Sequence, residues 1–114
     1  MSGITTHVLD LASGRPAAGV AVKLEILAPG KGWTALAERV TDADGRVKDL
    51  IAAGSQLDAG RYRLTFAVGE YHEKAGRPGF HPEVPVVFEV RDPSQSYHVP
   101  LLLSPFGYST YRGS

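Results

Sequence analysis

The chain has 114 residues, of which 43% are hydrophobic and 21% are charged, and its twelve basic residues balance its twelve acidic ones. We expect a single domain spanning residues 1–114, long enough to bury a hydrophobic core. A net charge of zero offers no basic surface for nucleic acid or for an anionic membrane. The sequence contains no cysteine, which excludes disulfide bonds and thiolate metal sites.

The N-terminus bears on where the protein resides in the cell. Only three residues precede the first expected strand, too few for a signal peptide, and no apolar run is long enough to cross a membrane. We therefore expect a cytoplasmic protein, although a chain whose signal peptide had been removed would give the same sequence.

Turn residues recur about every eight to twelve positions, a spacing typical of an all-β sandwich. In the first half of the chain, alternation of apolar and polar residues predicts strands over residues 4–11, 20–27, 33–41 and 46–51. Asp42-Ala43-Asp44-Gly45 separates the last two, and Asp-Gly indicates a tight turn because both residues tolerate positive φ. Arg46 is the first residue after that turn.

The second half of the chain continues the same pattern, with one interruption. We expect strands over residues 61–68, 86–90, 96–104 and 107–114. The only helical candidate lies within residues 69–79, where Glu70 and Lys74 form an i,i+4 pair and Gly76 and Pro78 are expected to stop the helix. The prediction is therefore an all-β fold, a two-sheet antiparallel sandwich of about eight strands with one short helix.

Two histidines stand on expected strands from opposite ends of the chain. His7 shares one face of the first strand with apolar residues, and His98 shares one face of the penultimate strand with Pro100 and Leu102. Pro100 forfeits a ladder hydrogen bond inside an apolar strand, so strand stability does not explain it. Taken alone, each feature is ordinary: a histidine on a strand is usually a bystander, and Arg46 after a turn is usually a surface charge.

The histidines do not predict a metal site. The sequence has four of them, His7, His72, His81 and His98, and none of the intervals between them is a zinc-ligand spacing, so we expect neither a metal nor another cofactor. The sequence also lacks a glycine-rich phosphate loop and the G-x-S-x-G turn of serine hydrolases. Spacing alone therefore identifies no catalytic motif.

The two ends of the chain carry long motifs that can be compared with known families. "THVLDLASGRPAAGV" at the front and "YHVPLLLSPFGYSTYRGS" at the end resemble the transthyretin-like family, and more narrowly its enzymatic branch, the 5-hydroxyisourate hydrolases. "TDADGR" and "FHPEVPVVFEV" match in between, so the resemblance covers essentially the whole chain. The closing Tyr-Arg-Gly-Ser is typical of the hydrolases rather than of the hormone carrier.

The resemblance implies a fold, an assembly and a set of site residues. The fold would be a prealbumin-like sandwich. Four copies would form a homotetramer, a dimer of dimers with a central channel and with active sites where subunits meet. The residues implied as catalytic are His7, Arg46 and His98. Those implied as binding substrate are Tyr111, Arg112, Gly113 and Ser114.

The implied reaction belongs to urate degradation in purine metabolism. Water would attack C6 of the small-molecule substrate 5-hydroxyisourate and open the N1–C6 bond, giving 2-oxo-4-hydroxy-4-carboxy-5-ureidoimidazoline. A neutral histidine near Arg46 would suit the role of general base, and Arg46 would stabilise the developing oxyanion. The resemblance does not decide between His7 and His98 as the base, nor whether Ser114 acts through its hydroxyl or its carboxylate.

Two other classes of protein stay open at this point. A transthyretin-like carrier of an aromatic ligand would have the same fold, since fold does not determine function. Such a carrier would need neither His7 nor His98 nor the closing tetrapeptide, which favours the hydrolase. A β-sandwich adaptor that binds another protein would be expected to be secreted, and the lack of cysteine and of a signal peptide argues against it.

Overall fold

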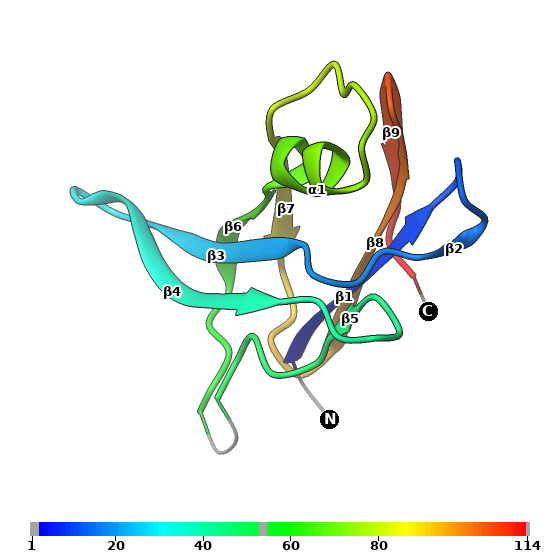
Figure 1. The fold of residues 1–114 in the computed structure, drawn as a ribbon. Helices are drawn as coiled ribbons and strands as arrows, with labels where there is room; N and C mark the ends of the chain where they lie inside the picture. Colours follow the sequence, from blue (N-terminus) through cyan, green and yellow to red (C-terminus); the bar gives the residue numbers. More distant parts are fainter. Residues whose placement is uncertain (1–2, 53–54, 114) are drawn as a thin grey trace.

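Two β-sheets and one short helix make up the described part of the chain, residues 3–52 and 55–113, in a computed structural model (Figure 1). The helix, α1, spans Val68–Lys74 and lies at one end of the two sheets. The strands in chain order are β1 (Gly3–Asp10), β2 (Arg15–Pro16), β3 (Ala21–Ala28), β4 (Gly32–Val40), β5 (Arg46–Val47), β6 (Gly60–Phe66), β7 (Val84–Val90), β8 (Ser96–Ser104) and β9 (Gly107–Thr110). The expected all-β sandwich with one short helix is confirmed.

The strands divide into a sheet with the order β2–β1–β8–β9, in which β5 also pairs with β1, and a sheet with the order β4–β3–β6–β7. Within the described residues, every pair is antiparallel except β1 and β8, which run parallel. The expectation of a wholly antiparallel sandwich is wrong at this pair. Because β1 and β8 come from opposite ends of the chain, no tight turn forces them into opposite directions.

The core lies between the two sheets and follows the two-residue periodicity of the strands. Along β1, burial alternates, so that Ile4, Thr6 and Val8 face inward while Thr5 and His7 face outward and are half-buried. A similar alternation on β3, β6, β7 and β8 completes one core cluster, which includes Val22, Leu24, Tyr62, Leu64, Phe66, Val84, Val86, Val90, Tyr97, Val99, Leu101 and Leu103. Every second residue of β1 and β8 is thereby left on the outer face of its sheet.

Most predicted elements agree with the structure to within two residues, and the exceptions have local causes. The strand expected over residues 46–51 is wrong beyond Val47, because the chain leaves the sheet there and buries Leu50 in the core. Val68 starts α1 instead of ending a strand. The two-residue strand β2 was not expected, since it is too short to show alternation.

Helix α1 is the only helix in the part of the chain that the structure describes. It follows Ala67, which offers no side-chain cap, and it ends before Gly76, whose φ of +72° lies in the left-handed region that glycine adopts readily. The stop signal expected at Gly76 is confirmed. No helix within residues 3–52 and 55–113 is long and apolar enough to cross a membrane.

The last predicted strand, over residues 107–114, is interrupted. β9 ends at Thr110, and one further bridge joins Gly113 to His98, whose carbonyl accepts the Gly113 N–H at 2.7 Å. Pro100 lies two residues beyond His98 on β8, so its backbone faces the same neighbouring segment, but proline has no N–H to donate. The missing donor accounts for the gap in the ladder between Thr110 and Gly113.

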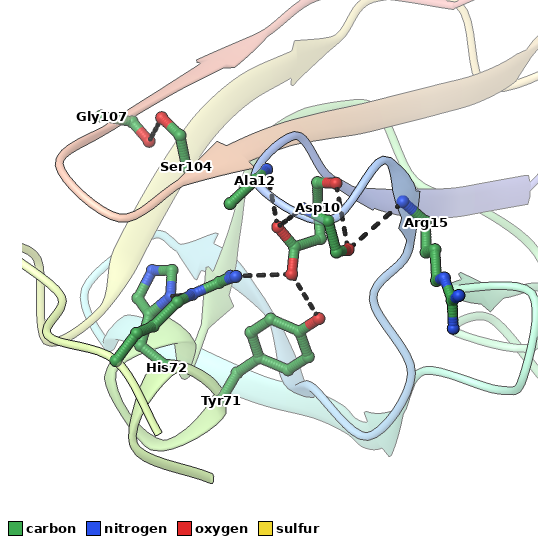
Figure 2. A network of polar contacts seen from close by, with 9 residues as sticks. Asp10, Ala12, Arg15, Tyr71, His72, Ser104 and Gly107 are labelled. Atoms are coloured by element: carbon green, nitrogen blue, oxygen red, sulfur yellow. Dashed lines mark hydrogen bonds and ion pairs between the residues drawn. The ribbon is translucent and has the colours of Figure 1, made fainter. Parts of the chain in front are cut away.

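A buried polar cluster fixes the end of β1 (Figure 2). The Asp10 carboxylate accepts hydrogen bonds from the Tyr71 hydroxyl and from Arg77 Nη2, both at 2.7 Å, and from the Ala12 N–H at 2.9 Å. Arg77 Nε also donates to His72 Nδ1 at 3.1 Å. Asp10 and His72 are each only 2% exposed. The cluster connects β1 to α1 and to the segment that follows the helix.

The same contacts set the protonation states in this cluster. Burial by itself would raise the pKa of the Asp10 carboxyl, but the hydrogen bonds from Arg77 and Tyr71 outweigh it and lower that pKa to about 2. Burial, and then the hydrogen bond to Asp10, raise the pKa of Tyr71 to about 12. Burial and the Arg77 charge lower the pKa of His72. Asp10 is therefore charged and His72 neutral at neutral pH.

Candidate active site

Adjacent strands bring the predicted catalytic residues onto one face of a sheet. β5 and β8 lie on either side of β1 (Figure 1). The β1–β5 pairing places His7 opposite Arg46, and the β1–β8 pairing places His98 opposite Thr5. All four residues are half-buried, in alternation with residues of the core. Because neighbouring strands lie about 4.8 Å apart, these residues form one continuous surface roughly 10 Å wide.

A tight turn positions Arg46 on this face. The Asp42 carbonyl accepts the Gly45 N–H, and Asp42 Oδ1 accepts the N–H groups of Asp44 and Arg46, each at 2.9 Å. Gly45 has a φ of +75°, and a Cβ at this position would lie 2.4 Å from the Val8 backbone oxygen because the turn packs directly on β1. Glycine is needed here for both its conformation and its size. The predicted Asp-Gly turn is confirmed.

The His98 ring is held from two sides. Thr5 Oγ1 and His98 Nδ1 share a hydrogen bond of 2.8 Å. On the other side, a Cβ added to Gly113 would lie 2.6 Å from His98 Cδ2 and 3.4 Å from Pro100 Cγ, so only glycine allows the terminal segment to approach this closely. These contacts leave Nε2 as the ring nitrogen without a hydrogen bond inside the described part of the chain.

The electrostatics of this face favour a neutral histidine beside a cation. Burial, then the Arg46 charge and then His7 lower the pKa of His98 below its ordinary value of 6.5. The Arg46 guanidinium forms no ion pair with any residue of 3–52 or 55–113. It therefore keeps its full charge for an anionic or carbonyl oxygen of a ligand. A neutral imidazole and an unpaired guanidinium can together supply a base and an electrostatic clamp.

The closing tetrapeptide is divided between the two faces of the sheet. Gly113 lies against His98, on the outer face. Arg112 turns the other way: its guanidinium lies 4.4 Å from the centre of the ring of Tyr97, a core-facing residue, and donates to Gln95 Oε1 at 3.1 Å. Of these two, the structure brings only Gly113 against a predicted catalytic residue, His98.

The other two residues of the tetrapeptide are Tyr111 and Ser114. Tyr111 is 55% exposed and lines a cavity of about 240 Å³ with Val86 and Phe88, at the edge of the sandwich where β7 meets the terminal segment. Ser114 lies outside the described residues, so its predicted contact with substrate is not placed. Contacts of Tyr111 and Arg112 with a substrate stay predictions of the sequence.

The four histidines go to three different places. His7 and His98 share the outer face, His72 belongs to the buried Asp10 cluster, and His81 packs edge-on between the rings of Phe80 and Tyr108, at 4.9 and 5.0 Å. Within residues 3–52 and 55–113, no three His, Cys, Asp or Glu side chains gather in a way that could hold a metal ion.

Sequence reasoning did not single out Thr5. A signal for it exists, because Thr5 stands two residues before His7 and so shares its strand face. That it meets His98 depends on the parallel register of β1 and β8, which join residues more than ninety positions apart. Alternation within one strand carries no information about that register.

The two sheets and the histidine–arginine surface define a transthyretin-like β-sandwich. The chain belongs to the HIUase/Transthyretin family, which it matches over residues 4–113. It is 50% identical over 118 residues to a 5-hydroxyisourate hydrolase of Caulobacter vibrioides, with all of both chains covered. Among solved structures, the 5-hydroxyisourate hydrolase of Klebsiella pneumoniae is 39% identical with a TM-score of 0.85, covering 100% of this chain and 94% of that one.

A transthyretin solved with a bound ligand is at least as similar in backbone. Sea bream transthyretin, solved in complex with thyroxine, is 37% identical with a TM-score of 0.90, covering 96% of this chain and 93% of that one. The TM-scores of 0.85 and 0.90 do not separate the enzyme from the carrier. The distinction has to come from the side chains on the outer face of the sheet.

Proposed function

We propose that this chain hydrolyses 5-hydroxyisourate to 2-oxo-4-hydroxy-4-carboxy-5-ureidoimidazoline, a step of urate degradation. The observation that carries the proposal is the joint placement of His7, Arg46 and His98 on one sheet face, with Gly113 of the closing tetrapeptide against the His98 ring. The 50% identity to a protein named for this activity supports the same substrate. A binding surface for an aromatic ligand alone would not require a neutral imidazole beside an unpaired guanidinium.

The proposed chemistry begins with water. His98 or His7 takes a proton from water, whose oxygen bonds to C6 of the substrate while the C6 carbonyl becomes an oxyanion. The oxyanion then collapses, the N1–C6 bond breaks, and the histidine returns the proton to N1. C6 stays in the product as a carboxylic acid, which releases its proton to solvent and becomes a carboxylate, so atoms and charge balance without another reactant. The lowered pKa of His98 keeps it neutral, as a base must be at neutral pH.

The proposed role of Arg46 is electrostatic. Its guanidinium, unpaired within the described residues, would stabilise the oxyanion at C6 and orient the oxygen-rich ring of the substrate. The terminal segment, from Tyr111 to Ser114, would complete the site, with Gly113 allowing its approach to His98. No cofactor enters this scheme.

We further propose that the chain acts as a single domain in a homotetramer, a dimer of dimers. One core cluster links both sheets. The edge strands β7 and β9 lie beside each other around the edge cavity, and Val87 on β7 and Tyr108 on β9 are 54% and 41% exposed. Unpaired edges of this kind are templates for strand pairing with another copy. Light scattering should give about four times the mass of one chain, and the mass of one chain would contradict the assembly.

A cytoplasmic location stays a prediction of the sequence.

The activity can be tested directly. Urate is oxidised enzymatically to generate fresh 5-hydroxyisourate, the protein is added, and the decay of the ultraviolet absorbance of the substrate is compared with the spontaneous rate. We expect a large acceleration that persists after dialysis against EDTA. Decay at the spontaneous rate, together with tight binding of an aromatic ligand, would favour the carrier instead. Activity that EDTA abolishes and zinc restores would contradict the metal-free scheme.

A further inference from the structure

The hydroxyl of Thr5 forms a hydrogen bond with the ring of His98. Thr5 Oγ1 lies 2.8 Å from His98 Nδ1, on the outer face where His7 and Arg46 also stand. The neighbouring threonine behaves differently: Thr6 Oγ1 is buried and donates to the Val99 carbonyl at 2.6 Å. The side chains of these two adjacent threonines of β1 thus point to opposite faces of one sheet.

A hydroxyl can donate to Nδ1 or accept from it, and the two cases give different tautomers of His98. If the hydroxyl donates, the ring proton is on Nε2, and the only nitrogen that faces the site has no free lone pair. If the hydroxyl accepts, the ring proton is on Nδ1 and Nε2 presents its lone pair. Only the second arrangement survives the catalytic cycle unchanged, because Nδ1 keeps its proton whether Nε2 is free or protonated.

We propose that Thr5 is a positioning residue that accepts the Nδ1–H of His98 and thereby makes Nε2 the proton-accepting atom of the site. The inference rests on the proposed hydrolase function and assigns the general base to His98 rather than to His7. Gly113 packs against the Cδ2 edge of the same ring, so the ring is contacted on its Nδ1 edge by Thr5 and on its Cδ2 edge by the terminal segment. Thr5 itself acts through His98.

The tautomer can be read without any assay of activity. Protein labelled with ¹⁵N-histidine gives ring-nitrogen NMR shifts that distinguish Nδ1–H from Nε2–H in neutral imidazole. We expect His98 of the wild-type protein to carry its proton on Nδ1, and Thr5→Val to lose this preference while Thr5→Ser restores it. Thr6→Val is the matched control, since it removes an adjacent threonine hydroxyl from the opposite face and should leave the His98 shifts unchanged.

Kinetics supply the second readout. Loss of one neutral hydrogen bond corresponds to about a tenfold change, so kcat of Thr5→Val should fall about tenfold, with KM nearly unchanged if Thr5 acts through His98 as proposed. The acid limb of the pH profile should move to lower pH, because the hydroxyl accepts more strongly from imidazolium than from neutral imidazole. Thr5→Ser should recover most of kcat, and Thr6→Val should keep the wild-type pH profile even if it lowers the thermal midpoint.

Each result decides for or against the proposal. A wild-type His98 with its proton on Nε2, or a Thr5→Val variant with wild-type kcat and pH profile, would overturn it. A wild-type protein that holds the Nδ1–H tautomer but does not accelerate the decay of 5-hydroxyisourate would instead contradict the proposed function, and the tautomer measurement would still stand. The two failures are therefore distinguishable on one set of samples.

Discussion

Arg77 and Arg46 each lie near a histidine, one inside the fold and one on its outer face. Burial and the neighbouring arginine lower the pKa of the histidine in both places, His72 in the first and His98 in the second. The two regions differ in what else the arginine meets. Arg77 is paired at 2.7 Å with the Asp10 carboxylate, whereas Arg46 has no ion-pair partner within residues 3–52 and 55–113.

A histidine–arginine pair is present in both regions, so it does not distinguish them. The structural cluster differs from the reactive face because its arginine is also paired with a carboxylate, that of Asp10. In the Asp10 cluster the positive charge is neutralised, and the His72 ring nitrogen Nδ1 is occupied by Arg77 itself. On the outer face the guanidinium has no ion-pair partner, and Nε2 of His98 has no hydrogen bond, among the residues that the structure describes. Buried polar networks with all members paired rigidify a fold, while unpaired groups in a half-buried setting are suited to bind and react.

The largest expected effect is on activity, from His98→Asn. Loss of a general base typically costs on the order of 10²-fold or more in rate, and we expect a fall of that size in kcat/KM with little change in thermal midpoint. His7→Asn tests the other candidate on the same face, and His81→Asn is a control outside it. Normal turnover in both His7→Asn and His98→Asn would remove the two histidines from the mechanism. The outer face would then be no more reactive than the Asp10 cluster.

The opposite signature is expected for Asp10→Asn, a change in stability rather than in turnover. Removing the carboxylate leaves Arg77 without its counter-charge in a setting where its side chain is only 20% exposed. Breaking such a pair should cost about 3 kcal/mol of unfolding free energy and lower the thermal midpoint by about 10 °C. The rate of the protein that stays folded should be nearly unchanged.

Asp49→Asn provides the matched control for that experiment. Asp49 also pairs with an arginine, Arg39 at 3.3 Å, but its side chain is 74% exposed. Exposed ion pairs contribute at most about 1 kcal/mol, so the thermal midpoint should hardly move. Equal losses of stability in Asp10→Asn and Asp49→Asn would contradict the special role assigned to the buried cluster.

Gly113→Ala should produce a smaller and more local effect. The added Cβ would lie 2.6 Å from His98 Cδ2, so either the ring or the terminal segment must move. We expect kcat to fall about tenfold, since small misplacements of a catalytic group are costly, while the thermal midpoint changes little. In Gly107→Ala the new Cβ would meet its nearest neighbour, Ser104 Oγ, at an ordinary 3.8 Å, and activity should be retained. Equal activity in the two variants would show that the tetrapeptide glycine is not needed for its size.

The sequence predicted elements that depend on local chemistry and missed those that depend on pairing. Alternation located the long strands, and Asp-Gly located the turn before Arg46, because both signals act over a few residues. The parallel pairing of β1 with β8, and with it the Thr5–His98 contact, joins the two ends of the chain and has no local signal. The opposite directions of Gly113 and Arg112 agree with simple alternation along the last strand, whereas the break in the ladder at Pro100 is not part of that pattern.

The predicted pH dependence separates the His98 base from the Asp10 carboxylate by the pH range in which each titrates. The pKa of His98 is lowered from 6.5, so kcat/KM should rise with pH through a pKa below 6.5 and level off at neutral pH, where the base is unprotonated. The same shifts in His98 and His72 mean that the unfolded chain binds protons more readily, so stability declines as pH falls below 6.5.

Asp10 contributes in a different and more acidic window. Its pKa is lowered from 3.8 to about 2, so the stability it adds is fully present above 3.8 and is lost as pH falls through about 2. Between these windows the protein should be folded, with its Asp10–Arg77 pair intact, yet slow, because His98 is protonated. Initial rates and thermal midpoints measured on one preparation from pH 4 to 8 test this directly. The separation should vanish in Asp10→Asn, whose unfolding would move toward the pH at which activity falls. If wild-type activity and folding are instead lost together on acidification, then the reactive face and the buried cluster do not titrate independently.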